Sequence, residues 1–220
     1  EVSALKAIRQ LCVIDAQQVQ HRRMHVVDAH LILHRKVAKF IGRTVADAAA
    51  REPPQDRRGG LDLLGGININ AKGTASATAA LVNLGVGGDL SVDFSGVTVA
   101  ADFGINGAFV RGTLTVKTGS GADGLTLEDL QVLGAVALDT GDGPDVVSIE
   151  SGGTTSSTFF GPVAILLKGG ADQLNIGGGV PTEQAFFRGT FLANGGQGAD
   201  SKTIALNTQF LGGTPVFQSI

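Results

Sequence analysis

Four aspartates occupy equivalent positions in glycine-rich segments, and they are the residues of this sequence best placed to do chemistry. Asp123, Asp145, Asp172 and Asp200 each follow a glycine by eleven residues. If these segments are stacked turns, the carboxylates form a column in which neighbouring like charges repel. Backbone N–H donors, solvent or a bound cation must then compensate the charge.

Calcium is the cation that such a column would bind, because it prefers oxygen ligands. Its candidate ligands are Asp123, Asp142, Asp145, Asp172 and Asp200, and the second turn is the best candidate because Asp139 and Asp142 make it the most acidic. Calcium takes about six to eight oxygens, however, and an aspartate in each long turn supplies too few. We therefore expect the aspartates to cap their turns by accepting local backbone N–H groups, with calcium as the alternative.

Four histidines near the N-terminus form two pairs with a spacing of four residues: His21 and His25, and His30 and His34. On a helix each pair would share a face, as zinc ligands do. Basic side chains around them disfavour a cation: Arg22, Arg23, Arg35 and Lys36. We therefore favour no zinc site, and apolar residues at positions 33, 37, 41 and 45 predict an amphipathic helix over residues 29–50.

Nucleophilic catalysis has no support in the rest of the chain, because residues 61–220 contain no His and no Cys. Ser-His-Asp and Cys-His arrangements therefore cannot form within them. Carboxylate pairs, or Lys or Arg as a base, remain available for carbohydrate chemistry. Only six basic residues are present there, and the chain has no Trp or Tyr to line a sugar groove. We name no catalytic residue and expect no cofactor.

The aspartates belong to a repeat that predicts how they are positioned. Four segments align without a gap: 112–127, 134–149, 161–176 and 189–204. After the Asp, apolar and polar residues alternate, as in Val147-Ser148-Ile149, which is typical of a strand with one buried face. A glycine two residues before each Asp marks a tight turn with positive φ: Gly121, Gly143, Gly170 and Gly198. Each copy is predicted to be strand, turn, strand.

Stacked copies predict an all-β fold, a parallel β-helix or β-solenoid with about one turn per 22–28 residues. The Asp-to-Asp steps are 22, 27 and 28 residues, and the extra residues all precede the next glycine, so insertions should lie on one side of the coil. Apolar residues should stack inward, with one ladder formed by Leu127, Ile149, Ile176 and Ile204 and phenylalanines before the units as core stacks. Segments 64–69 and 87–92 are weaker copies, and 211–217 begins another unit.

The chain divides into two segments of different composition. Residues 1–60 hold 11 of the 17 Lys and Arg and 6 of the 20 acids, so their formal charge is about +5 and that of residues 61–220 is about −8. We expect residues 1–60 to be a basic helical or disordered segment and residues 61–220 to be the solenoid domain. The abrupt change also fits an N-terminal segment that is not native to the protein. Its single aromatic, Phe40, and lack of a motif disfavour nucleic acid binding.

The Gly-Ser-Gly-Ala-Asp123, Gly-Asp-Gly-Pro-Asp145 and Gly-Gln-Gly-Ala-Asp200 turns resemble Gly/Asp-rich β-solenoid repeats of bacterial extracellular or surface proteins. They are also partly similar to the calcium-binding nonapeptide of RTX proteins, Gly-Gly-x-Gly-x-Asp-x-U-x. Residues 195–200 match its first six positions, but Lys202 stands where the family has a large apolar residue. The resemblance implies a stacked parallel coil in a secreted or surface protein.

These observations favour a non-catalytic structural or adhesive repeat module of a bacterial extracellular or cell-surface protein. The alternatives are a carbohydrate-active β-helix enzyme, either polysaccharide lyase or hydrolase, and a calcium-stabilised solenoid. Expected partners are a surface polysaccharide or another cell-surface protein. No run of 18 apolar residues is present, so no membrane-spanning helix is expected.

Overall fold

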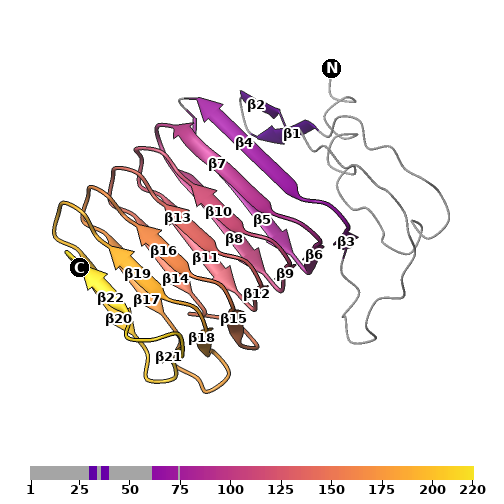
Figure 1. Ribbon diagram of the computed structural model, residues 1–220. Coiled ribbons are helices and arrows are strands. Elements are labelled where there is room, and N and C mark those ends of the chain that lie inside the picture. The colour runs from indigo at the N-terminus through magenta and orange to yellow at the C-terminus, as the bar shows by residue number, and fades with distance from the viewer. Residues whose placement is uncertain (1–29, 34–35, 40–60, 74) are drawn as a thin grey trace.

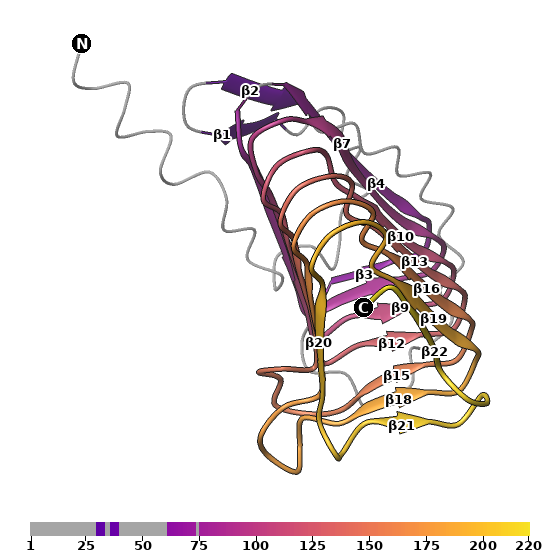
Figure 2. The same cartoon turned by 90° about the vertical axis from the view of Figure 1, so that its left-hand side faces the viewer.

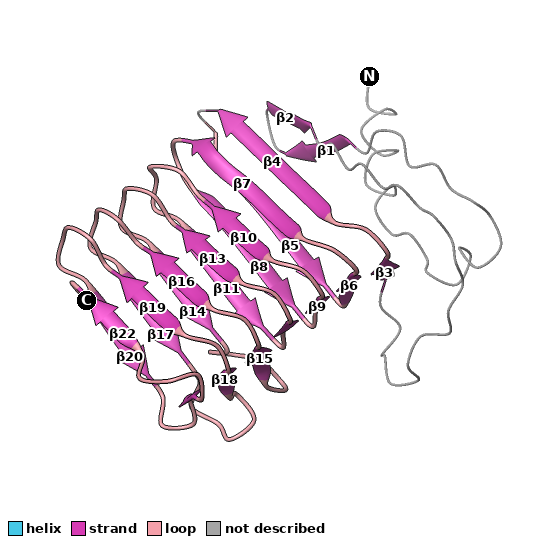
Figure 3. Cartoon of the chain, in the orientation of Figure 1, coloured by secondary structure: helices cyan, strands magenta, loops and turns pink. Residues whose placement is uncertain are grey.

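The strands of this chain stack into a parallel coil, seen in a computed structural model that describes residues 30–33, 36–39, 61–73 and 75–220 (Figure 1). Each rung, meaning one circuit of the coil, contributes one strand to each of three parallel sheets. The coil has six complete three-strand rungs, and two further strands follow them. The predicted parallel β-solenoid is therefore confirmed, and the described residues contain strands and loops but no helix (Figure 3).

The three sheets have different strand lengths. Sheet 1 has the shortest strands and consists of β3 (Leu61–Leu63), β6 (Leu84–Val86), β9 (Phe109–Val110), β12 (Gln131–Val132), β15 (Ser157–Phe159), β18 (Ala185–Phe187) and β21 (Gln209–Phe210). Sheet 2 consists of β4 (Ile67–Gly73), β7 (Leu90–Val97), β10 (Leu114–Lys117), β13 (Val136–Asp139), β16 (Val163–Leu166), β19 (Phe191–Asn194) and β22 (Val216–Gln218). Sheet 3 consists of β5 (Ala77–Val82), β8 (Ala101–Asn106), β11 (Gly124–Glu128), β14 (Val146–Ile149), β17 (Gln173–Ile176) and β20 (Ser201–Ile204).

The alternation of apolar and polar residues along the strands determines which side chains form the core. Leu127, Ile149, Ile176 and Ile204 pair in register from rung to rung, as predicted. The first three are fully buried and Ile204, on the last complete rung, is partly buried. Because side chains alternate between the two faces of a strand, this register also fixes which polar residues point outward.

The predicted phenylalanine stack forms between rungs of sheet 1. The rings of Phe159 and Phe187 lie 5.1 Å apart and nearly parallel, and the same distance separates Phe187 from Phe210. Phe160 differs from this prediction, because it follows Phe159 on the strand and therefore points outward, with 43% of its surface exposed. The stack thus uses one residue of each Phe pair, Phe159 and Phe187. Phe109 and Phe186 also differ from the prediction, because they pair at outward positions with Gln131 and Thr158 and are partly exposed.

The loops before β15, β18 and β21 are longer than the loops at the same corner of the earlier rungs. They project at a single corner of the coil, between sheets 3 and 1 (Figure 2). The predicted one-sided insertions are therefore confirmed. The segment 211–217 also begins a further unit as predicted, because it leads into β22.

Two sequence-based expectations need correction. The repeat contains a third strand, which belongs to sheet 1. This strand is only two or three residues long, too short for an alternating pattern to reveal it in the sequence. The segment 87–92 does not correspond to the Asp turn, since Leu90 pairs with Leu114, and Gly88 therefore stands level with Gly112, at the start of the unit. Both Leu90 and Leu114 are buried, and this apolar match decides the register.

The predicted helix over residues 29–50 is wrong where the structure describes it. β1 (His30–Leu33) and β2 (Lys36–Lys39) form an antiparallel pair in which Ile32 lies opposite Val37. β-Branched residues favour strands, which explains why helical spacing alone misled. The remainder of that prediction, and the side chains of His21, His25, His30 and His34, lie outside what the structure describes.

Candidate functional site: an aspartate ladder, an acid corner and a charged row

The four predicted aspartates form a ladder along the coil, at the start of the sheet 3 strands. The Oδ1 atom of Asp123 accepts the N–H of Ala101 on the preceding rung at 2.6 Å. Asp145, Asp172 and Asp200 repeat this bond, each accepting the N–H of the preceding aspartate at 2.8, 2.9 and 3.0 Å. The expected local capping occurs at Asp123, whose Oδ2 accepts the Gly119 N–H at 3.1 Å. It is wrong for Asp145, Asp172 and Asp200, which accept N–H groups of the preceding rung instead. The ladder thus joins neighbouring rungs.

Close packing of the glycine-rich turns positions this ladder. Gly143, Gly170 and Gly198 have positive φ values of 122°, 156° and 141°, as predicted. A Cβ at Gly143 would lie only 1.9 Å from the carbonyl oxygen of Gly121 on the preceding rung. Glycine therefore permits both the backbone conformation and the approach of one rung to the next. Gly121 lacks a positive φ, but a Cβ at this position would likewise lie only 1.8 Å from the carbonyl oxygen of Val99.

Burial controls the protonation of the ladder. Asp145 is fully buried, and its burial raises the pKa of its carboxyl from 3.8 to about 7, against the opposing effects of the Asp123 N–H that it accepts and of the nearby Thr140 hydroxyl. The Thr140 hydroxyl donates its proton to the Leu167 carbonyl at 3.1 Å, and the Oδ2 atom of Asp145 is buried without a hydrogen-bond partner. Burial and, more weakly, the charge of Asp200 also raise the pKa of Asp172. Protonation therefore relieves part of the repulsion between stacked carboxylates.

The fifth predicted ligand, Asp142, does not join the ladder. Its side chain is exposed, and its backbone N–H donates to the Gly119 carbonyl at 3.1 Å. Asp139, the last residue of β13 before that turn, instead forms an ion pair with Lys168, with 2.7 Å between Oδ1 and Nζ. In the part of the chain that the structure describes, no group of three or more His, Cys, Asp or Glu side chains is arranged to hold a metal ion.

A second cluster of carboxylates, the acid corner, comprises Glu128, Asp129 and Glu150 at the turn from sheet 3 to sheet 1. Glu150 is fully buried and its Oε2 accepts the Asp129 N–H at 3.0 Å and the hydroxyl of Ser157. Ser157 is buried as well and its Oγ accepts the Leu130 N–H at 2.8 Å. Buried polar groups thus join two neighbouring turns of the coil here, since unpaired ones would be costly.

The pKa values of the three carboxyls in the acid corner shift in different directions. Burial raises the pKa of Glu150 to about 7 and also raises that of Glu128. Asp129 faces solvent more, and hydrogen bonds from Thr154 and Thr155 outweigh burial and lower its pKa. Sequence reasoning missed this cluster, although Glu128 and Glu150 share one repeat position, five residues after Asp123 and Asp145.

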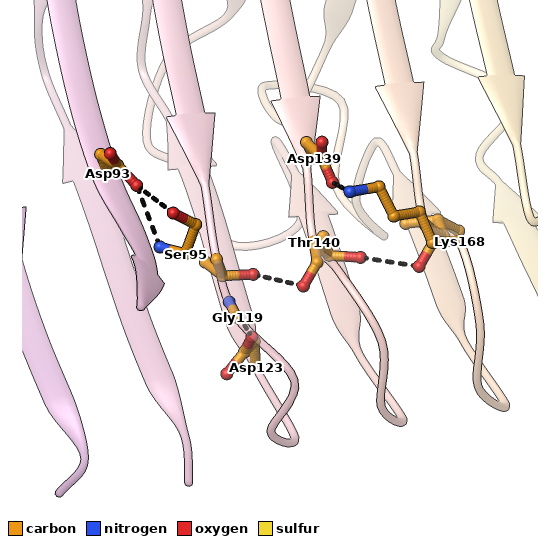
Figure 4. A network of polar contacts seen from close by, with 9 residues as sticks. Asp93, Ser95, Gly119, Asp123, Asp139, Thr140 and Lys168 are labelled. Carbon is orange, nitrogen blue, oxygen red and sulfur yellow. Dashed lines mark hydrogen bonds and ion pairs between the residues drawn. The ribbon is translucent and has the colours of Figure 1, made fainter. Parts of the chain in front are cut away.

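A row of charged side chains, the charged row, runs across the outer side of sheet 2, with its lysines exposed and its aspartates half-buried (Figure 4). Asp93, Lys117 and Asp139 lie opposite one another on successive strands. Lys168 adds the ion pair to Asp139 that Figure 4 shows. Asp93 accepts the Ser95 hydroxyl at 2.6 Å and its N–H at 3.1 Å. The Ser95 hydroxyl is the largest influence on the Asp93 carboxyl and holds its pKa below the usual value, with Lys72 and Lys117 adding to the effect.

No family model matches the chain, and no curated protein or solved structure matches it either. The class of protein is therefore defined by its fold, a parallel β-solenoid with an internal aspartate ladder. The described residues contain no helix that is long and apolar enough to cross a membrane.

Proposed function

We propose that this chain is a non-catalytic structural and adhesive repeat module of a bacterial extracellular or cell-surface protein. The observation that best supports it is the use of the repeated aspartates inside the coil. Their Oδ1 atoms bind backbone N–H groups of the neighbouring rung, so the most regular acidic feature of the sequence serves assembly of the rod. The resemblance of the glycine-rich turns to bacterial surface repeats supports the proposed location.

The protonation of the acids also favours a non-catalytic role. A general acid needs a pKa near the working pH and access to substrate. Asp145 and Glu150 have a raised pKa of about 7, but both are fully buried. Asp93 is more accessible, but its pKa is lowered, so it is ionised at neutral pH and has no proton to donate. The two requirements thus fall on different residues.

The charged row gives the alternative, a carbohydrate-active enzyme, one specific observation in its favour. Acid and base side chains alternate there on an outer face: Asp93, Lys117, Asp139 and Lys168. A polysaccharide lyase or hydrolase would use such neighbours as base and acid. The row lies on a sheet face where the structure places a surface ion pair, which by itself needs no catalytic explanation.

One experiment separates the two functions. The full chain is incubated with immobilised and soluble polysaccharides, both acidic and neutral, while retention on the polymer and release of reducing ends or unsaturated sugars are measured. We expect retention on at least one polymer without turnover. Saturable turnover that is lost in Asp139→Asn and kept in Asp142→Asn would overturn the proposal and establish the enzyme. Lack of retention on every polymer and on bacterial cells would contradict the adhesive role.

A further inference from the structure

The outward face of sheet 1 differs in charge from the rest of the coil. Residues 61–220 contain 14 acids and 6 bases, yet the sheet 1 strands and the positions directly after them hold a single acid, Asp62 in β3 on the first rung, and none from β6 onward. Both arginines of residues 61–220, Arg111 and Arg188, occupy that following position. Asp89 lies at the turn into sheet 2, where its carboxylate accepts the Thr113 N–H at 2.7 Å. From β6 onward this face is therefore basic on an acidic solenoid.

The residues that directly follow the sheet 1 strands form one column, which we call the arginine column: Arg111, Leu133, Phe160, Arg188 and Leu211. Each donates its backbone N–H to a carbonyl of the preceding rung, at 2.7–2.9 Å. The five residues therefore stand one above another at the spacing of the rungs, about 4.8 Å. Arg111 and Arg188 are three rungs apart, so about 14 Å of apolar surface separates the two positive charges.

The arginine column is exposed and chemically mixed. Leu133, Phe160 and Leu211 have 40%, 43% and 55% of their surface exposed, and both arginines are exposed. The Arg188 guanidinium carbon lies 5.3 Å from the centre of the Phe160 ring, within the range of a cation–π contact. The core does not need this ring, because Phe159 already fills the interior of the same rung. A line of exposed apolar side chains flanked by arginines is typical of a binding surface.

Charge and spacing together indicate the ligand. Two arginines without a neighbouring acid on this face are complementary to carboxylates, which a guanidinium can bind through two hydrogen bonds. A hexose advances an extended polysaccharide by a distance similar to the spacing between rungs, which is about 4.8 Å. Successive sugars along the coil would therefore meet successive members of the arginine column, with the apolar faces of some sugars on Phe160 and Leu133.

We propose that the arginine column binds an extended acidic polysaccharide that runs along the coil, with carboxylates at Arg111 and Arg188 and a sugar ring on Phe160. This proposal rests on the adhesive function above and names its ligand class. The bound polymer would cross at least four rungs, so binding requires an intact stack. Salt is expected to weaken binding, because charge pairs at an exposed surface are screened.

The test measures binding of polygalacturonate to the full chain by calorimetry, with the fully methyl-esterified polymer and polyglutamate as comparison probes. We expect Arg111→Gln combined with Arg188→Gln to weaken binding about tenfold or more, and Phe160→Ala to weaken it severalfold. Lys72→Gln combined with Lys202→Gln removes the same charge from other faces and is the matched control, expected to change affinity by less than about twofold. Circular dichroism verifies that each variant is folded.

Three outcomes would overturn this inference. Equal losses in the arginine and lysine variants would mean attraction by overall charge and not by this column. Binding of polyglutamate as tightly as polygalacturonate would mean a surface for acidic peptides. Failure to bind polygalacturonate, while the chain is retained on a neutral polymer or on cells, would remove the acidic ligand and leave the adhesive function standing.

Discussion

The buried carboxyl of Asp145 is expected to make the coil more stable in weak acid than in weak base. Its pKa is about 7 in the folded chain, against 3.8 for an ordinary aspartate. Between these values the folded chain holds a proton that the unfolded chain has released. The resulting stability is complete below about pH 3.8 and is lost as the pH rises through about 7. A shift of about three units corresponds to about 4 kcal/mol, of which about 3 kcal/mol is lost between pH 5 and pH 8.

Asp145→Asn removes the ionisable group and keeps the Oδ1 acceptor that binds the Asp123 N–H at 2.8 Å. We therefore expect the variant to lose about 3 kcal/mol less than wild type between pH 5 and pH 8, and to be the more stable protein at pH 8. Turn capping alone would predict a different result, a loss of about 0.5–2 kcal/mol at every pH. Urea unfolding followed by circular dichroism at the two pH values measures the free energies of unfolding.

Asp142→Asn is the matched control, since this exposed aspartate lies in the same turn. It should retain the pH dependence of wild type, and the contribution of Glu150 is common to all three proteins and cancels. An Asp145→Asn variant with the pH dependence of wild type would refute the argument, because the carboxyl would then be ionised in the fold. A calcium-dependent rise in stability at pH 8 that Asp145→Asn abolishes would instead establish the calcium-stabilised solenoid.

Three further changes test other parts of the fold. Ser157→Ala removes the hydroxyl that donates to Glu150 and accepts the Leu130 N–H, and should cost about 1–3 kcal/mol in urea unfolding; a cost no larger than that of Ser156→Ala would contradict the role of the acid corner. Gly143→Ala forces a Cβ to 1.9 Å from the Gly121 carbonyl at φ 122°, so it should destabilise the chain by more than about 3 kcal/mol. Gly152→Ala, with no atom within 4 Å of the added Cβ, should change stability by less than about 0.5 kcal/mol, and equal effects at the two sites would contradict the packing argument. Removal of residues 1–58 should leave the melting temperature of the coil nearly unchanged, although β2 contacts β4, and a drop of many degrees would show that the β1–β2 pair caps the first rung.

The sequence by itself was sufficient for the fold class and for the inner ladder of residues. The two-residue alternation around Val147 and Leu174 identifies strands with one buried face. The constant distance from glycine to aspartate identifies the rung, because only stacked copies can bury such strands. The same spacing placed Asp123, Asp145, Asp172 and Asp200 in one column, and the structure brings them together.

Tertiary structure alone decided what the side chains in that column contact. Oδ1 of each aspartate binds an N–H 22 to 28 residues away, and no local pattern specifies such a partner. The raised pKa of Asp145 likewise depends on burial by neighbouring rungs. The short sheet 1 strands and the arginine column also emerge only from stacking, because residues such as Arg111 and Arg188 lie far apart in sequence. Spacing along a chain fixes how often a residue recurs, whereas the packing of one rung on the next fixes what it touches.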